Sequence, residues 1–175
     1  WLQLPSRFSL FNFSLFSPMS TCIFPGKFQP FHEGHLMVVQ GMMKACGNVT
    51  IVIGDEQKMG PDAPFTVEQR REMISAALLA RDIMDANIVV ARADNGDGAW
   101  VTRVLEAAGE PEDAMVWSGN DHVRELFEAA GVATKKIVPV PGINSTNIRT
   151  LMHAHDPNFL KHIPSGAIDV VMASR

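Results

Sequence analysis

The sequence predicts an α/β fold built on one doubly wound, parallel, five-stranded sheet. Two patterns indicate it. Short apolar runs alternate with helical patterns, and several of these runs are rich in β-branched residues, as buried parallel strands are. The length of 175 residues fits one domain of ordinary size. Because such sheets bind ligands at the carboxyl ends of their strands, functional motifs are expected in strand-to-helix loops.

Each element of this fold has its own local signal. Apolar runs predict five strands, at residues 21–24, 49–53, 88–91, 115–117 and 136–140. Apolar residues at intervals of three and four predict helices at 34–45, 67–79, 100–108 and 121–130, with a helical tail from 146 to the end. Thr66 and Gln69 fit a capping box, Asn120 is a further N-cap residue, and Gly131 stands where a helix would stop.

The composition indicates a globular protein and limits its partners. Hydrophobic residues make up 46% and charged residues 19% of the chain, which excludes disordered, collagen-like and coiled-coil proteins. With a net charge of −4 and a pI of about 5.8, no general attraction to nucleic acid or an anionic membrane is expected, so any phosphate must be held locally. The sequence has no apolar run of 18 residues, and a cytoplasmic protein is expected. Cys22 and Cys46 are expected to be reduced, buried thiols.

The first 18 residues differ from the rest of the chain. They hold five of the thirteen aromatic residues and a single charge, Arg7, and Met19 directly precedes the first expected strand. Residues 1–18 are therefore expected to be an upstream or non-native extension, and residues 19–175 a single domain. A targeting peptide is the alternative, although Asn12 and several serines interrupt its apolar run.

The loop after the first expected strand carries the richest chemistry. Residues 25–35 read P-G-K-F-Q-P-F-H-E-G-H and open into a helix, whose first amide groups can bind an anion. His32 and His35 lie on one helix face, Lys27 adds a fixed positive charge, and Gly34 lets a ligand come close. This combination suits a polyphosphate, beside which protonated imidazoles would be favoured. The loop is neither a P-loop nor a G-x-G-x-x-G turn.

Other interpretations of this loop stay open. An ordinary surface or core pair is one alternative for the two histidines, although their place in this loop makes it less favoured than in an arbitrary helix. A zinc site is a further alternative, but H-E-x-x-H is absent and a third ligand would have to come from Cys22, Cys46 or His122. Phe28 and Phe31 are expected to pack in the core rather than to stack on a base.

A second segment repeats the same physics after the fifth expected strand. Residues 142–149 read G-I-N-S-T-N-I-R and lead into a helix, where hydroxyl groups and free amides can hold phosphate. Arg149, one turn into the helix, can reach the same anion with its bidentate guanidinium group. The alternative is a capped helix with a solvated arginine.

Together the two segments resemble a known pair of motifs. The stretch G-K-F-Q-P-F-H-E-G-H-L is similar to the H-x-G-H signature of the nucleotidyltransferase superfamily, and I-N-S-T-N-I-R is similar to its second signature. Further matches follow in order between Thr21 and Val171, so the chain resembles the archaeal type of nicotinamide mononucleotide adenylyltransferase. The resemblance implies a Rossmann-like nucleotidyltransferase fold. It also implies transfer of the adenylyl group of ATP to nicotinamide mononucleotide, which forms NAD and pyrophosphate.

The resemblance assigns a role to each matching residue. His32, His35 and Arg149 would be catalytic, with His35 nearest the reacting α-phosphate. The implied contacts to ATP and its phosphates are Gly26, Lys27, Phe28, Gly34, Gly119, Asn120, Arg124, Ser145 and Thr146. The implied contacts to the nicotinamide substrate are Trp100, stacked on the ring, with Gln57 and Arg70. Mg²⁺ is expected to arrive with ATP, held mainly by substrate oxygens and water, and the chain is expected to form a homo-oligomer.

Three departures and several rival interpretations qualify the resemblance. Lys27 stands where the family usually has arginine, and Asn144 where it often has serine. The segment between Val140 and Ser145 is also shorter than in typical archaeal relatives. A sister enzyme would use the same chemistry on phosphopantetheine or another phosphorylated acceptor, or would use CTP on an alcohol phosphate. A non-catalytic nucleotide-binding module would bind its ligand without releasing pyrophosphate. Trp100 also fits a core residue, and Arg70 and Arg124 fit solvated helix charges.

Overall fold

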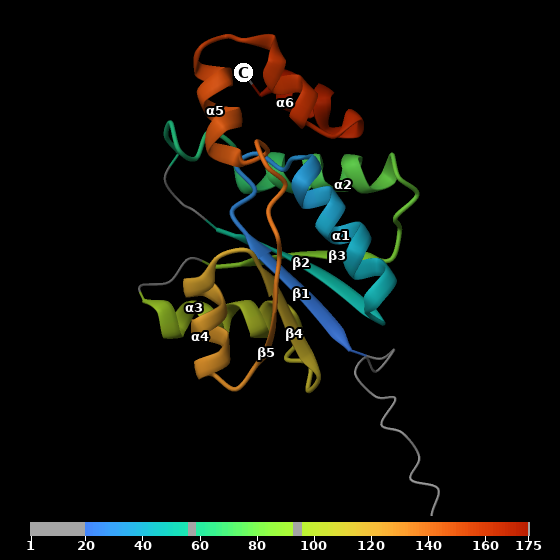
Figure 1. Ribbon diagram of the computed structural model, residues 1–175, viewed down its shortest axis with the longest axis vertical. Helices are drawn as coiled ribbons and strands as arrows, with labels where there is room; N and C mark the ends of the chain where they lie inside the picture. Colours follow the sequence, from blue (N-terminus) through green and yellow to red (C-terminus); the bar gives the residue numbers. More distant parts are fainter. Residues whose placement is uncertain (1–19, 56–58, 93–95, 175) are drawn as a thin grey trace, which may run out of the picture.

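The computed structural model describes residues 20–55, 59–92 and 96–174 (Figure 1). Residues 1–18, predicted to lie outside the domain, are outside this described part. The sheet has parallel strands in the order β3-β2-β1-β4-β5, which confirms the predicted doubly wound fold. The strands are β1 (Thr21–Gly26), β2 (Asn48–Gly54), β3 (Ala86–Ala91), β4 (Ala114–Ser118) and β5 (Ala133–Lys136). The winding therefore reverses between the neighbours β1 and β4.

Helices cover both faces of the sheet (Figure 1). On one face, α1 (Glu33–Ala45) and α2 (Val67–Leu79) pack together with the C-terminal elements, and on the other lie α3 (Asp97–Ala107) and α4 (Asp121–Ala129). The predicted helical tail is divided. It consists of α5 (Ser145–His153), two 3₁₀ helices (Pro157–His162 and Ser165–Ala167) and α6 (Ile168–Ala173). No helix in the described part of the chain is both long and apolar enough to cross a membrane.

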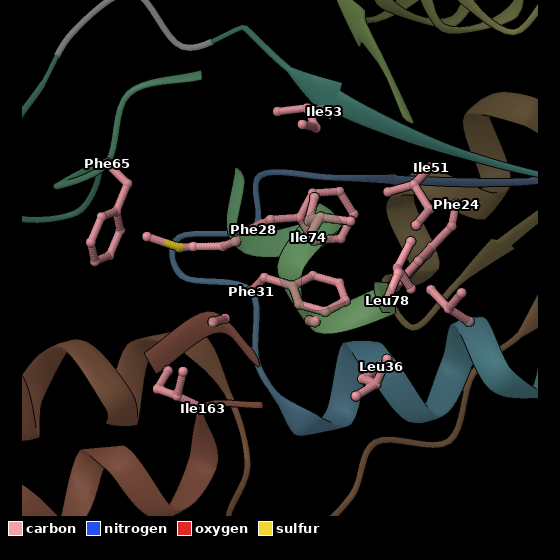
Figure 2. Packing of buried hydrophobic residues seen from close by; sticks show 14 of the residues in the cluster. Phe24, Phe28, Phe31, Leu36, Ile51, Ile53, Phe65, Ile74, Leu78 and Ile163 are labelled. Carbon is pink, nitrogen blue, oxygen red and sulfur yellow. The ribbon is translucent and has the colours of Figure 1, made fainter. Parts of the chain in front are cut away.

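Strand side chains alternate between the two layers, because successive residues of a strand point to opposite faces. Phe24 of β1 joins the core on the side of α1 and α2, which Figure 2 shows from close by. Ile23, its neighbour in the strand, joins the core on the side of α3 and α4. Both side chains are buried. Burial on both faces explains why β1 is a continuous apolar run rather than an alternating one.

The capping signals in the sequence mark the helix ends correctly. Gln69 donates its amide to Thr66 Oγ1 at 3.2 Å, and Thr66 donates its amide to Gln69 Oε1 at 2.8 Å, which completes the predicted capping box of α2. The Asn120 side chain caps α4 by accepting from the His122 amide at 3.0 Å. Gly131, just after α4, has a φ of 80°, which glycine adopts without steric cost.

The fifth strand lies earlier than predicted. The sequence suggests residues 136–140, but β5 is Ala133–Lys136, a short polar strand that pairs with β4 at the edge of the sheet. An edge strand has one open side and needs no apolar run. The apolar residues 137–140 instead leave the sheet and line a cavity that is described below. The prediction therefore mistook the wall of a cavity for a buried strand.

The prediction of two separate reduced thiols is also wrong. Cys22 and Cys46 form a disulfide, with 6.0 Å between their Cα atoms. Cys22 lies in β1, and Cys46 is the C-cap residue of α1, so the packing of the helix against the strand brings them together. Their separation of 24 residues in the sequence gives no sign of this contact.

Candidate active site

Two cavities open at the carboxyl ends of the strands and meet where the winding reverses. The histidine cavity, of about 430 Å³, is bounded by the start of α1, the segment 137–140 and the turn before α5. The tryptophan cavity, of about 480 Å³, lies over the ends of β1, β2 and β3 beside α3. Pro25, Ser118 and Asn120 line both cavities. Ligands in the two cavities would therefore be neighbours, at the position where doubly wound sheets bind ligands.

His32 and His35 form the start of α1 and line the histidine cavity. Their rings stack, with centroids 3.6 Å apart and an interplanar angle of 16°. His32 Nδ1 accepts a hydrogen bond from the His35 amide, and His35 Nδ1 accepts one from the His32 amide, both at 3.3 Å. The pair is thus a capping box made of imidazoles. Because each Nδ1 is an acceptor, a neutral ring carries its proton on Nε2 and can donate it to a ligand.

Burial keeps both imidazoles neutral at physiological pH in the protein alone. Removal from water, with repulsion from His162, lowers the pKa of His32 from 6.5 to about 4. Burial and the neighbouring His32 lower the pKa of His35 well below its ordinary value. Protonation of the two imidazoles beside a bound triphosphate stays a prediction, because it depends on the charge of that ligand. What the protein itself offers is a pair of neutral Nε2–H donors.

An aromatic cluster holds the histidine rings in place. His35 lies edge-on to Phe24 and Phe28, with centroids 5.9 and 5.0 Å away, and stacks on Phe31 at 5.5 Å. The packing predicted for Phe28 and Phe31 is confirmed, since they are 2% and 0% exposed. The buried Phe28 ring therefore supports His35, and it is not among the residues that line either cavity. Gly26 makes room for that ring, because a Cβ there would lie 2.8 Å from it.

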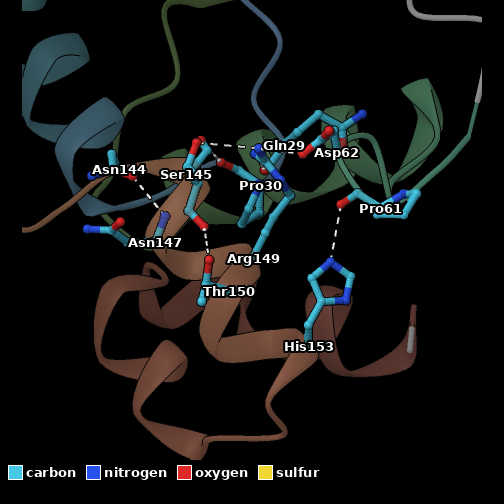
Figure 3. A network of polar contacts seen from close by, with 11 residues as sticks. Gln29, Pro30, Pro61, Asp62, Asn144, Ser145, Asn147, Arg149, Thr150 and His153 are labelled. Carbon is cyan, nitrogen blue, oxygen red and sulfur yellow. Dashed lines mark hydrogen bonds and ion pairs between the residues drawn. The ribbon is translucent and has the colours of Figure 1, made fainter.

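The second predicted segment folds back onto the first, as expected (Figure 3). Asn144 caps α5 by accepting from the Asn147 amide at 2.8 Å, and Ser145 Oγ donates to the Pro30 carbonyl at 3.3 Å. Ile143 and Asn144 line the histidine cavity together with the start of α1. Two turns separated by more than a hundred residues of sequence therefore meet at one cavity.

Arg149 reaches the first turn but lies against the outer side of it. Its guanidinium group donates to the Gln29 carbonyl at 2.9 Å, and also contacts Asp62 Oδ1 at 3.3 Å and Thr146 Oγ1 at 3.4 Å (Figure 3). Among the described residues it lines a separate hollow with Phe65, and not the histidine cavity. The Asp62 side chain is 98% exposed, and ion pairs with so exposed a carboxylate are weak. A phosphate group can therefore replace Asp62 as the partner of Arg149.

The tryptophan cavity has an aromatic wall and charged margins. Trp100 of α3 is half-buried, lines the cavity, and lies edge-on to Phe127 with 5.4 Å between centroids. Lys27 is exposed and lines this cavity, and it is not among the residues that line the histidine cavity. Gly119 lines the histidine cavity, and Asn120 lines both cavities.

Arg70 occupies a structural position rather than the predicted substrate-binding one. Its side chain is 0% exposed. The guanidinium group donates to the carbonyl oxygens of Lys27 at 2.7 Å, Gly54 at 2.8 Å and Thr66 at 3.2 Å. Arg70 therefore cannot contact a substrate in this conformation. It ties the ends of β1 and β2 to the start of α2, and so fixes the edge of the tryptophan cavity.

The remaining predicted site residues lie apart from the cavities or outside the described residues. Arg124 pairs with Asp121, which Lys136 also contacts at 3.2 Å, so a contact to phosphate would require Arg124 to leave this pair. Gln57 falls in the segment 56–58, outside the described residues. Within the described part of the chain, no three His, Cys, Asp or Glu side chains are grouped to hold a metal ion.

Comparison with known proteins agrees with this geometry. A family model described as cytidylyltransferase-like matches residues 23–151. The nicotinamide-nucleotide adenylyltransferase of Pyrobaculum aerophilum is 30% identical over 160 residues, which cover 89% of each chain. That of Ignicoccus hospitalis is 32% identical over 154 residues, which cover 85% of this chain and 89% of the relative. This chain belongs to the nicotinamide-nucleotide adenylyltransferase family.

Solved structures share the fold of this adenylyltransferase family member. A bifunctional NMN adenylyltransferase/ADP ribose pyrophosphatase from Francisella tularensis, complexed with AMP and a manganese ion, matches 78% of this chain with a TM-score of 0.66 and 22% identity. The NadR protein in complex with NAD and AMP-PNP matches 85% with a TM-score of 0.63 and 16% identity. This chain spans 42% and 46% of the lengths of these two proteins. At such identities the likeness establishes the fold alone.

Sequence analysis missed two charged residues of the site. Asp55 directly follows β2, Arg92 directly follows β3, and both line the tryptophan cavity. The signal that identifies them is their place at the carboxyl ends of strands, where doubly wound sheets bind ligands. They lie outside any sequence motif, so motif matching passed over them.

Proposed function

We propose that this member of the nicotinamide-nucleotide adenylyltransferase family transfers the adenylyl group of ATP to the phosphate of nicotinamide mononucleotide. The products are NAD and pyrophosphate. The observation that carries the proposal is the junction of two cavities at the ends of β1 and β4, one with a helix start and paired imidazoles, the other with an aromatic wall. ATP would occupy the histidine cavity and the acceptor the tryptophan cavity, so the reacting phosphates would meet at their shared wall.

The reaction requires alignment and charge stabilisation rather than a protein nucleophile. An oxygen of the acceptor phosphate attacks the α-phosphorus of ATP. The bond from that phosphorus to the oxygen bridging to the β-phosphate breaks, and pyrophosphate leaves with the electron pair. The Nε2–H groups of His32 and His35, with the first amides of α1, would donate to the phosphate oxygens where negative charge accumulates. His35 would act nearest the α-phosphate.

Arg149 would stabilise the leaving pyrophosphate. The α5 turn carries Ser145 and Thr146 beside it, and this turn contacts the loop that leads to the histidines. A phosphate that displaces Asp62 would receive both arms of the guanidinium fork. Such a contact would strengthen as charge moves onto the pyrophosphate, and it would therefore favour the transition state.

The tryptophan cavity suits a flat, charged acceptor. Trp100 supplies an aromatic wall for the pyridine ring, and Lys27 supplies a positive charge for the acceptor phosphate. Mg²⁺ would enter with ATP, with its ligands drawn mainly from phosphate oxygens and water. When bound, it would neutralise charge on the triphosphate. Assembly into a homo-oligomer stays a prediction, and light scattering on the purified protein would test it.

A pyrophosphate-release screen tests the proposal. ATP and CTP are each offered with nicotinamide mononucleotide, phosphopantetheine and an alcohol phosphate. Release is expected with ATP and nicotinamide mononucleotide, accompanied by NAD that a coupled dehydrogenase can reduce. Release only with another pair would assign a different acceptor or nucleotide. Tight ATP binding without release in any combination would favour the non-catalytic module.

A further inference from the structure

Gln29 is a buried polar residue of the loop that leads to the histidines, three residues before His32. It is 2% exposed and is not among the residues that line either cavity. Its side chain makes two hydrogen bonds to the backbone of Phe65. Nε2 donates to the Phe65 carbonyl oxygen at 2.8 Å, and Oε1 accepts from the Phe65 amide at 3.0 Å. The carboxamide group of Gln29 is therefore engaged inside the fold and does not itself reach a substrate.

The main chain of Gln29 holds Arg149. Its carbonyl oxygen accepts from the Arg149 guanidinium group at 2.9 Å, between residues 120 positions apart in the sequence (Figure 3). The contacts of the same guanidinium group to Asp62 and Thr146 are longer, at 3.3 and 3.4 Å. The Asp62 side chain is 98% exposed and the Arg149 side chain only 13%. The Gln29 carbonyl is therefore the fixed partner of Arg149, and the Asp62 carboxylate is the one that a ligand can replace.

A carbonyl oxygen suits this role better than a carboxylate would. It is neutral, so it orients the guanidinium group without cancelling the positive charge that a phosphate would meet. The guanidinium group has five N–H donors, and each terminal nitrogen carries two of them. Arg149 can therefore keep the Gln29 carbonyl with one N–H and still present both terminal nitrogens to a phosphate.

The Gln29 side chain fixes the place of this carbonyl. Phe65 is 2% exposed and directly precedes Thr66, the N-cap residue of α2, so the two bonds to its backbone tie the loop to the start of that helix. Bonds of this kind are hard to replace, because water does not reach the groups that they satisfy.

The segment 61–65 also contacts α5. Asp62 contacts Arg149, and His153 Nε2 lies 3.3 Å from the Pro61 carbonyl oxygen (Figure 3). Gln29 contacts both of these parts, the segment 61–65 through its side chain and α5 through its main chain. The loop, the segment and the helix therefore form one closed set of contacts around the Arg149 guanidinium group.

We propose that Gln29 is a positioning residue for Arg149, an inference that rests on the proposed function. Its carboxamide group, held by the Phe65 backbone, fixes the carbonyl oxygen that orients the guanidinium group toward the leaving pyrophosphate. One arm of Arg149 stays anchored on Gln29, while the other exchanges Asp62 for phosphate. Part of the orientation is then present before ATP binds, which is when a charged donor stabilises a transition state most effectively.

The test begins with Gln29→Met, which keeps the length of the side chain and removes both hydrogen bonds to Phe65. Displacement of Arg149 should lower kcat/KM for ATP about 10-fold, a part of the about 10²-fold effect expected for the arginine itself. The KM for the acceptor should stay near the wild-type value. Gln40→Met is the matched control, since Gln40 is a half-buried residue of α1 that is not among the residues lining either cavity. Its kinetics should match those of the wild type.

The double variant decides whether Gln29 acts through Arg149. In the Arg149→Met background, Gln29→Met should lower kcat/KM for ATP by no more than about 2-fold further, because the group that it positions is absent. Losses that multiply, to about 10³-fold in the double variant, would overturn the inference. Gln29 would then act on the nearby histidines or on the fold as a whole. Wild-type kinetics in Gln29→Met would overturn it as well.

A measurement on the wild-type chain keeps the inference testable if thermal unfolding shows that Gln29→Met does not fold. In a crystal structure with a non-hydrolysable ATP analogue, Arg149 should leave Asp62 and stay within hydrogen-bond distance of the Gln29 carbonyl oxygen. An Arg149 that leaves both partners to hold the triphosphate would overturn the inference. Absence of pyrophosphate release by the wild-type chain with every pair of substrates would instead overturn the proposed function, a result distinct from all of these.

Discussion

The two turns that meet at the histidine cavity are built in opposite ways. In the first turn, residues 26–35, His32 is 6% exposed, caps a helix and stacks on a second imidazole. In the second turn, residues 142–149, half of the residues are exposed, and Arg149 is held by the Gln29 carbonyl, the exposed Asp62 carboxylate and the Thr146 hydroxyl group. The first turn therefore offers neutral donors in a fixed geometry, and the second offers a charge that can change partners.

This difference indicates that the two turns have different roles in the reaction. Donors that stabilise a transition state are most effective when they are already oriented before the substrate arrives. A positive charge that stabilises a leaving group is more effective on a side chain that can move with that group. The predictions below test whether the fixed turn and the adaptable turn contribute in these two ways.

The largest effect is expected at the fixed turn, in His35→Asn. Asparagine can still accept from the His32 amide, but it lacks the Nε2–H that would reach the phosphate. Loss of one oriented donor should lower kcat by about 10²- to 10³-fold and change the KM for ATP much less. Steady-state kinetics with saturating acceptor measure both constants.

A matched control separates this effect from a general change of histidine. His155→Asn alters an exposed histidine with a φ of 53°, a conformation that asparagine tolerates. Its kinetics should match those of the wild type. A His35→Asn enzyme with wild-type kcat would remove the assigned role of the ring.

At the adaptable turn, Arg149→Met should lower kcat/KM for ATP by about 10²-fold, because a bidentate contact to pyrophosphate would be lost. Arg149→Lys keeps the charge without the fork and should recover part of the loss. Arg103→Gln serves as the control, since that exposed arginine pairs with Glu106 away from both cavities. Wild-type kinetics in Arg149→Met would show that Arg149 only braces the Gln29 carbonyl.

The sequence predicted best those features whose causes are local. The bounds of α2 match the prediction at both ends, because its capping box and apolar spacing lie within the helix itself. The meeting of the two turns also follows from local order, since parallel strands end at one edge of the sheet. Among the site residues, His32, His35 and Asn120 were found because motifs carry them.

The sequence did not predict the features that depend on packing between segments far apart in the chain. The solvated or substrate-binding roles considered for Arg70 follow from its charge, but its burial against three backbone carbonyls depends on how β1, β2 and α2 come together. The Cys22–Cys46 disulfide has the same origin. The apolar run 137–140 looked like a strand because strand and cavity wall require similar residues.

The fixed turn also predicts how stability depends on pH. The pKa of His32 is about 4 in the folded protein and 6.5 ordinarily, so the unfolded chain binds more protons between these values. The contribution of neutral His32 to the stability of the fold is therefore intact above pH 6.5, and it is lost as the pH falls toward 4. Between pH 7 and pH 5 the free energy of unfolding should fall by up to about 2 kcal/mol on this account.

Urea unfolding of His32→Asn at both pH values checks this prediction. Asparagine is a good N-cap residue and does not titrate, so the variant should lose less stability than the wild type on acidification. His155→Asn should follow the wild type. Identical pH dependence in His32→Asn and wild type would show that the His32 ring is not held neutral by burial.

The smallest effect is expected outside both turns, in Trp100→Ala. Loss of the aromatic wall should raise the KM for the pyridine nucleotide by about 5-fold, because a ring contact of this kind contributes about 1 kcal/mol. The KM for ATP should stay near the wild-type value. A raised KM for ATP with an unchanged acceptor KM would reverse the assignment of the two cavities.

The central claim is that the fixed and the adaptable turn hold one triphosphate between them. A crystal structure with a non-hydrolysable ATP analogue tests this most directly. It should place phosphate oxygens within hydrogen-bond distance of both His35 Nε2 and the Arg149 guanidinium group, with Asp62 released from Arg149. A triphosphate bound away from His35, or held by His35 while Arg149 stays on Asp62, would contradict the account.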